Sequence, residues 1–258
     1  MANDFSPREG ELRMSLLDHL DELRVRFTRA FIALVVGTII GVVVAGGVFE
    51  LLLAPYCQLG VSADCRLQTL GPTEGVVAYF RVSLTVGAML AIPYMTYQLM
   101  MFVLPGLERH EKRLILLSLP AITLLFIVGV LFAWFLLMPP ALGFLQEFQP
   151  TLFKPEWTAD LYLSFITALV FWMGVAFETP LVFFVLSVLG FVRAGGLVRN
   201  WRIAVVGASV AAAMITPTVD PVNMFLVMAP LLGLYVISIA LVAIGQRLNA
   251  GQAPPKLP

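Results

Sequence analysis

Six apolar segments, separated by polar or charged turns, constrain the fold of this chain more than any other feature of its sequence. They are residues 27–53, 76–104, 114–138, 161–191, 201–215 and 224–244. A helix rises 1.5 Å per residue, so most of these segments can cross the ~30 Å hydrocarbon core of a bilayer. Within lipid, a chain satisfies its backbone polar groups only as helices or as a closed barrel. The segments therefore predict an all-α integral membrane protein with six transmembrane helices.

The composition supports this class and excludes two others. Hydrophobic residues make up 60% of the chain and charged residues only 12%, which is too apolar for a soluble globular protein. The formal net charge is zero, so the chain lacks the basic field that attracts nucleic acid. The polar residues 1–26 do not resemble a cleavable signal peptide, and we expect the first apolar segment to direct insertion.

Prolines predict the shape of the helices. Pro93, Pro120 and Pro180 interrupt three long apolar segments, and each removes a backbone hydrogen bond. We expect long, bent helices that form a curved, cup-like wall. The last two segments are shorter, and residues 201–215 would extend only ~22 Å as a helix. We therefore expect two short final helices and a thinned membrane beside them.

The lysine and arginine residues predict the orientation of the chain. With the N-terminus inside, the segments outside the membrane contain only Arg66, Arg81 and Lys154 of the 16 basic residues. Basic residues accumulate on the cytoplasmic side, so both termini are predicted to be cytoplasmic. We expect a disordered N-terminus over residues 1–15, a membrane domain over residues 16–245 and a disordered tail over residues 246–258.

Glu178 is an acidic residue near the middle of the fourth apolar segment. A charged side chain at bilayer depth is costly, so such residues face protein or water and are often functional. Pro180 should bend the helix beside it and make a concave side. One interpretation is that Glu178 serves function on that side. The alternative is that it is protonated or hydrogen-bonded to a neighbouring helix and only stabilises the bundle.

Acidic residues also occur on the predicted cytoplasmic face, where basic residues are the norm. Asp21 and Glu22 precede the first apolar segment, and Glu108 and Glu111 follow the second. Two acidic patches beside a groove would bind a cationic peptide, because arginine pairs strongly and selectively with carboxylates. The alternative is that these acids pair with basic neighbours in the same segment, such as Asp21 with Arg24 or Glu108 with Lys112.

Other chemistry is not indicated. His19 and His110 stand beside charged residues without partners at the spacing of metal ligands, and no catalytic arrangement appears, so we predict neither an enzyme nor a cofactor. Cys57 and Cys65 lie in the first loop, which is predicted to be outside the membrane. An oxidising compartment permits a disulfide between them, and two separate thiols are the alternative.

Four motifs, taken together, resemble the TatC family, the multi-spanning subunits of the twin-arginine protein translocase. They are HLDELR at residues 19–24, FVLPGL at 102–107 with two following acids, FETP at 177–180, and ITP at 215–217 followed by Asp220. The resemblance implies six helices in the bacterial cytoplasmic membrane. It implies recognition of the twin-arginine signal peptides of folded cargo, and assembly with single-span TatA- and TatB-like proteins or with further copies of the chain. It also implies transport driven by the proton-motive force.

The same resemblance assigns roles to individual residues. Glu22 and Glu111 correspond to the acids that contact the arginine pair, and Arg24 and Phe102 belong to the same recognition surface. Glu178 corresponds to the intramembrane acid that meets a polar group of a partner helix. Two further positions, Pro55 and Asp220, correspond to outer-face positions linked to function.

Two other functions fit the residues alone. A proton-coupled solute transporter would use Glu178 as its proton site, although the apolar segments offer few other polar groups for a relay. A scaffold would gather partner helices without binding a signal peptide. Solute flux into liposomes separates the transporter from the other two functions.

Overall fold

The computed structural model describes the backbone of residues 16–58, 65–103, 109–149, 151–152, 156–217 and 220–250. Side chains are described over the same ranges except for residues 16–19, 103–119 and 248–250. The elements of this described part are helices, with one isolated bridge between Gln68 and Thr158. In chain order they are α1 (Leu16–Gln58), α2 (Glu74–Val103), α3 (Arg109–Phe132), the π-helical turn η2 (Ala133–Leu137), α4 (Met138–Glu147), α5 (Ala159–Val188), α6 (Ala194–Arg199), α7 (Trp201–Ile215) and α8 (Pro221–Ala250).

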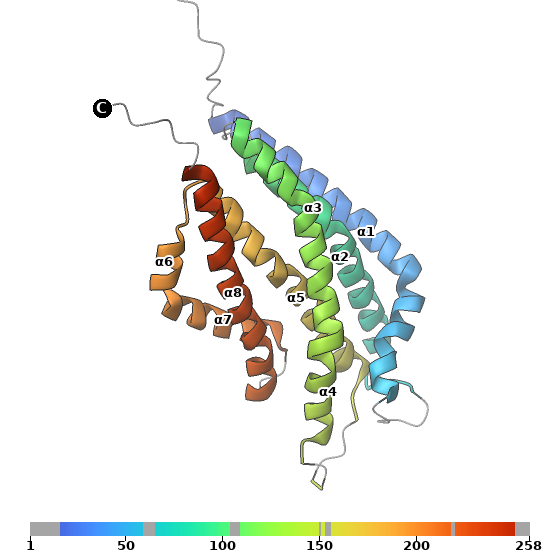
Figure 1. Ribbon diagram of the computed structural model, residues 1–258. Coiled ribbons are helices and arrows are strands. Elements are labelled where there is room, and N and C mark those ends of the chain that lie inside the picture. Colours follow the sequence, from blue (N-terminus) through green and yellow to red (C-terminus); the bar gives the residue numbers. More distant parts are fainter. Residues whose placement is uncertain are drawn as a thin grey trace, which may run out of the picture.

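Within the described residues, five helical stretches are long and apolar enough to cross a membrane. They are Leu20–Gln58, Glu74–Phe102, Pro120–Glu147, Ala159–Val188 and Pro221–Arg247. These stretches confirm the prediction of an all-helical membrane protein. The apolar helix α7 has only 15 residues, so the count of six spans stays a prediction. The start of α1, the start of α3 and the end of α8 lie at the same end of the molecule (Figure 1).

The prediction of two short final helices holds for α7, with 15 residues, and is wrong for α8, which spans 30 residues and contains Pro230. Pro221 begins the helix. A backbone N–H at this position has no acceptor within the helix, so proline, which lacks an N–H, loses no hydrogen bond there. The helix then continues through polar residues beyond the apolar segment, because intrahelical hydrogen bonds do not require apolar side chains. It ends at Ala250, past residue 245 where the sequence analysis ended the membrane domain.

Residues 139–147 were expected to be part of a loop, and they are helical instead. The helix passes from α3 through η2 into α4, and the N–H of Met138 bonds to the carbonyl oxygen of Ala133 in the π-helical turn. Pro139 and Pro140 fall in the first turn of α4. A change of helical register there accommodates two residues that lack an N–H, so they do not end the helix.

Prolines inside helices accompany bends rather than ends. Pro55, Pro93, Pro120, Pro180 and Pro230 all lie inside helices. Each removes a hydrogen bond within its helix, which weakens the helix on one side. Figure 1 shows that α1 and the continuous helix from α3 to α4 change direction along their lengths. The predicted long, bent helices are therefore observed.

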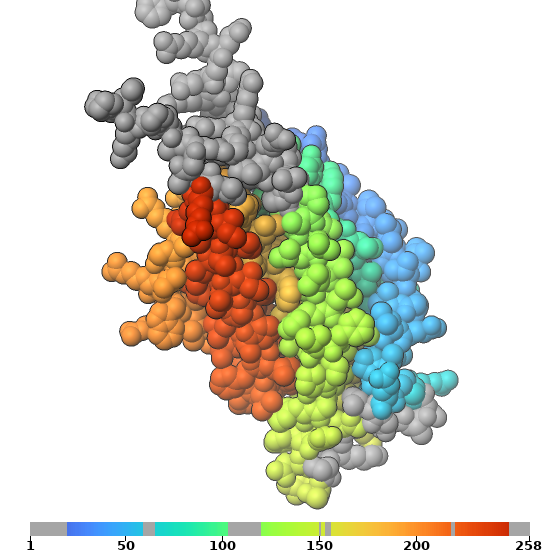
Figure 2. Space-filling view, in the orientation of Figure 1, coloured from blue at the N-terminus to red at the C-terminus, as the bar shows by residue number. Residues whose placement is uncertain are grey.

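Helix α5 lies at the centre of the molecule. It packs against α2, α3 and α8, while α1 packs mainly along α2 and α7 packs along α8 (Figure 1). Many α5 side chains are buried, among them Leu163, Ile166, Leu169 and Met173. Figure 2 shows α8 and α3 covering much of α5 on one face of the molecule. This central position lets α5 present one side to α3 and α8 and another toward α2.

A polar network ties the segment before α2 to the start of α5. The carboxylate of Glu74 accepts hydrogen bonds from the backbone N–H groups of Leu70 (2.6 Å), Gly71 (3.3 Å) and Asp160 (3.0 Å). The guanidinium of Arg81 forms an ion pair with the Asp160 carboxylate. These bonds fix α2 and α5 relative to each other at the end of the molecule where α1 ends.

Candidate functional site

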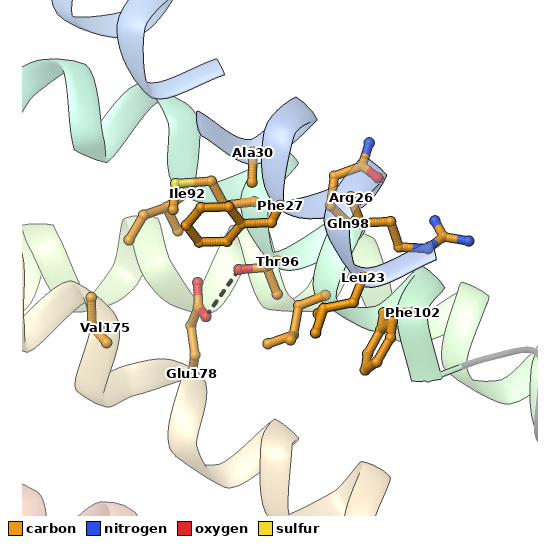
Figure 3. Close-up of a pocket in the computed structure, with 12 residues that line it drawn as sticks. Leu23, Arg26, Phe27, Ala30, Ile92, Thr96, Gln98, Phe102, Val175 and Glu178 are labelled. Carbon is orange, nitrogen blue, oxygen red and sulfur yellow. Dashed lines mark hydrogen bonds between the residues drawn. The ribbon is translucent and has the colours of Figure 1, made fainter. Parts of the chain in front are cut away.

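A groove of about 350 Å³ opens between α1 and α5, with α2 at its base (Figure 3). Its walls are almost entirely apolar. The lining residues are Leu23, Arg26, Phe27 and Ala30 of α1, Ile92, Met95, Thr96, Gln98, Leu99 and Phe102 of α2, and Val175 and Glu178 of α5. The groove thus brings together Phe102 and Glu178, which belong to different sequence motifs. It also contains Gln98, which the sequence analysis did not single out.

Glu178 faces this groove and not the surrounding lipid. Its side chain is 8% exposed, and its Oε2 accepts a long hydrogen bond of 3.4 Å from the Thr96 hydroxyl (Figure 3). Its other oxygen, Oε1, is buried without a hydrogen-bond partner. The stabilising role considered as an alternative therefore accounts for one oxygen only. The second oxygen remains available to a donor that enters the groove.

Glu22 lies on α1 near Leu23 and Arg26, which line the groove. Its Oε1 accepts hydrogen bonds from Arg26, including one of 2.9 Å from Nε, and the two side chains form an ion pair one helical turn apart. Its Oε2 is buried and has no partner. Pairing with a basic neighbour does occur, but through Arg26 and not between Asp21 and Arg24 as the alternative suggested. Half of the Glu22 carboxylate remains open to a further donor.

The other predicted recognition residues are only partly described. Phe102 lines the groove, and Arg24 is exposed on α1, one turn before Thr28, whose hydroxyl donates to the Arg24 carbonyl oxygen. Glu111 belongs to the first turns of α3, and its side chain lies outside the described residues. The same applies to Glu108, whose predicted pairing with Lys112 is not described. That Glu22 and Glu111 contact the same pair of arginines therefore stays a prediction.

Pro55 and Asp220 do not line the groove. Pro55 lies inside α1 next to Tyr56, which belongs to the buried core. Asp220 precedes α8, and its carboxylate accepts hydrogen bonds from the backbone N–H (2.7 Å) and the side-chain amide (3.0 Å) of Asn223. This is the geometry of a residue that caps the start of a helix. In this structure Asp220 therefore stabilises the start of α8.

Gln98 is the groove residue that the sequence analysis missed. It is 3% exposed, it lines the groove, and its Oε1 is buried without a partner. A polar amide two residues after Thr96 in an apolar segment was the available signal. Its importance was not visible in the sequence because a glutamine in such a segment usually finds a partner on a neighbouring helix.

The described residues bear on the alternative functions as well. Glu178 is the one ionisable side chain among the buried polar residues of the described part. The described residues contain no group of three or more side chains able to hold a metal ion. A series of buried carboxylates or histidines, which a proton relay would use, is therefore absent from the part of the chain described here.

Cys57 and Cys65 are free thiols in the structure, and their side chains are close enough to interact. Neighbouring thiols of this kind can be joined by an oxidant. We expect protein isolated from an oxidising compartment to contain this disulfide. Mass spectrometry after thiol alkylation should detect labelling only when a reductant is added first. Complete labelling of both thiols without reductant would show that no bridge forms.

Comparison with known proteins agrees with the motifs and with the helical architecture. The family model of the Sec-independent protein translocase protein TatC matches residues 18–230. The TatC protein of Aquifex aeolicus is 39% identical over 91% of this chain and 97% of its own length. That of Synechocystis is 36% identical over 87% of this chain and 86% of its own length.

The solved structures show the same relationship in three dimensions. The crystal structure of a twin-arginine translocase receptor, TatC, superposes with a TM-score of 0.80 at 38% identity, and covers 89% of this chain and all of the solved chain. A second TatC crystal structure, obtained in the detergent DDM, gives a TM-score of 0.78 at 39% identity. The chain, a multi-pass membrane protein, therefore belongs to the TatC family of Sec-independent protein translocase proteins.

Proposed function

We propose that this protein is the subunit that binds twin-arginine signal peptides of folded cargo and assembles with TatA- and TatB-like single-span partners. The proposal includes a bacterial cytoplasmic membrane location, both termini in the cytoplasm, and export driven by the proton-motive force. The observation that carries it is the apolar groove. One carboxylate oxygen of Glu22, near one end of the groove, has no hydrogen-bond partner, and neither has one of Glu178, farther inside.

The end of the groove near Glu22 suits a guanidinium group. Arg26 already occupies Oε1 of Glu22, while Oε2 is buried and unpaired. An unpaired buried carboxylate oxygen costs free energy until a donor reaches it, and hydrogen bonds to charged groups are among the strong ones. In the proposal, Glu22 and Glu111 share the arginine pair, and Arg24 and Phe102 complete the recognition surface.

The inner part of the groove suits a membrane helix that carries one polar side chain. Glu178 presents an unpaired oxygen within apolar walls made by Ile92, Met95 and Val175. A polar group on a partner helix gains by leaving lipid for such an acceptor. Glu178 is therefore proposed as the contact for a TatA- or TatB-like partner.

The test is binding of a twin-arginine peptide and of a twin-lysine peptide to the purified protein in nanodiscs. Lysine lacks the planar, forked set of donors that suits two carboxylate oxygens, so we expect the twin-lysine peptide to bind at least ~10-fold more weakly. Glu22→Gln together with Glu111→Gln should remove this difference. Equal affinity of the unmodified protein for both peptides would contradict the receptor function and favour a scaffold.

No specific observation supports the alternative function as a proton-coupled transporter. No second carboxylate or histidine lines the described groove, and the hydrogen-bond partner of Glu178 there is the hydroxyl of Thr96. Liposomes that contain the protein should therefore show no solute-dependent proton flux above that of empty liposomes.

A further inference from the structure

Gln98, in the wall of the groove, carries a buried hydrogen-bond acceptor without a partner. It belongs to α2, it is 3% exposed, and its Oε1 lies buried without a partner. Figure 3 shows Gln98 and Arg26 on the side of the groove away from Glu178. The wall of the groove therefore contains a second buried acceptor, at some distance from the carboxylate of Glu178.

The described neighbours of Gln98 offer no donor to its Oε1. Arg26 is the nearby cation of the groove, and its guanidinium bonds to Glu22. The other neighbours along this wall, Leu23, Leu99 and Phe102, are apolar. Burial without a partner makes the amide destabilising, whereas an apolar residue of similar length would fill the same volume without this cost. Residues that lower stability in this way are often retained for binding.

A peptide helix that enters the groove would bring the matching donors. The first four N–H groups of any helix have no acceptor within the helix, and lipid offers them none. The apolar segment of a signal peptide follows its arginine pair, so the first turn of that segment would lie just inside the end of the groove near Glu22. Gln98 lines the groove together with Arg26, the partner of Glu22.

We propose that Gln98 accepts a hydrogen bond from the backbone N–H groups at the start of the apolar helix of a bound signal peptide. Gln98 is thus a binding residue additional to those that contact the arginines, and the inference rests on the proposed receptor function. Because a backbone N–H is present in every peptide, the contact depends on where the helix begins and not on its side chains. It selects peptides whose apolar helix starts directly after the arginine pair.

The test replaces Gln98 with methionine, which keeps the length of the side chain and removes the amide. Binding of the twin-arginine peptide to the Gln98→Met protein in nanodiscs should weaken about 5- to 10-fold, the value of one hydrogen bond to an otherwise unpaired group. The thermal midpoint of the free variant should be equal to or higher than that of the unmodified protein. A residue with a purely structural role would not produce this combination.

Ser187→Ala is the matched control. Ser187 is also buried, but its hydroxyl donates to the carbonyl oxygen of Val242 at 3.0 Å, far from the groove residues in the fold. Its loss should lower the thermal midpoint and leave peptide affinity unchanged, which is the opposite pattern. A peptide with N-methyl groups on the first three apolar residues should bind the unmodified protein and Gln98→Met equally.

Two results would overturn the inference. Equal affinity of Gln98→Met and the unmodified protein for the unmethylated peptide would exclude the hydrogen bond. A lower thermal midpoint of Gln98→Met would show that the amide stabilises the free protein instead. Either result leaves the preference for twin arginine over twin lysine intact, whereas loss of that preference in the unmodified protein would contradict the receptor function itself.

Discussion

Cells whose only copy of this protein carries Glu178→Ala are expected to lose export of folded cargo almost completely. The substitution removes the buried oxygen that lacks a partner in the groove, together with the one that accepts from Thr96. A polar contact between membrane helices contributes about 1–2 kcal/mol, so partner association should weaken roughly 5- to 30-fold. Export of a reporter fused to a twin-arginine signal peptide measures the loss.

Signal-peptide binding separates this role from a general defect. Crosslinking of the peptide to Glu178→Ala should remain near that of the unmodified protein, because Glu22 and Arg26 are unchanged. Glu50→Ala is the matched control, since Glu50 is likewise an acid within an apolar segment, in α1, but is exposed and does not line the groove. Normal export by Glu178→Ala would remove the case for an intramembrane partner contact.

Gly41→Ala is expected to destabilise the protein strongly, although it adds a single methyl group. Helices α1 and α2 approach closely where Gly37 and Gly41 face Gly87 and Ser83, and a Cβ at Gly41 would collide with the backbone carbonyl of Ser83. A backbone atom cannot move aside as a flexible side chain does. We expect a loss of about 3 kcal/mol or more, above the usual cost of overpacking a core. The thermal midpoint in detergent and the yield of folded protein report this loss.

Gly46→Ala provides the control on the same helix. Nothing lies within 4 Å of a Cβ built at Gly46, so the added methyl meets open space. Alanine favours a helix over glycine by about 1 kcal/mol, and this variant should be unchanged or slightly more stable. Equal effects of the two substitutions would show that α1 and α2 do not pack as closely as the structure indicates.

Individual residues show where reading the sequence succeeded. Glu178 was expected to turn away from lipid because an unpaired charge in hydrocarbon is costly, and it does so. Pro93, Pro120 and Pro180 were expected to bend helices that continue, and all three lie inside helices. These expectations rest on local covalent chemistry and on the solvent, which do not depend on the neighbours of a residue.

Other residues show where it failed. Gln98 was overlooked, because the sequence does not tell whether a polar side chain finds a partner on another helix. Asp21 was considered as the partner of Arg24, whereas the ion pair on this part of α1 joins Glu22 to Arg26 and leaves Oε2 of Glu22 without a partner. The end of α8 was set too early, at the last apolar residues, although the helix continues through polar ones.

The sequence by itself determined that the chain forms apolar helices in a membrane, because lipid provides no partners for backbone polar groups and only regular structure satisfies them. The four motifs also determined the family, which the matches to TatC proteins then showed. Only the tertiary structure decided that α1, α2 and α5 enclose one groove, and that Glu22, Gln98 and Glu178 each have an unpaired oxygen. The physical reason is that helical periodicity assigns residues to faces, whereas the partners of a face depend on which helices pack together.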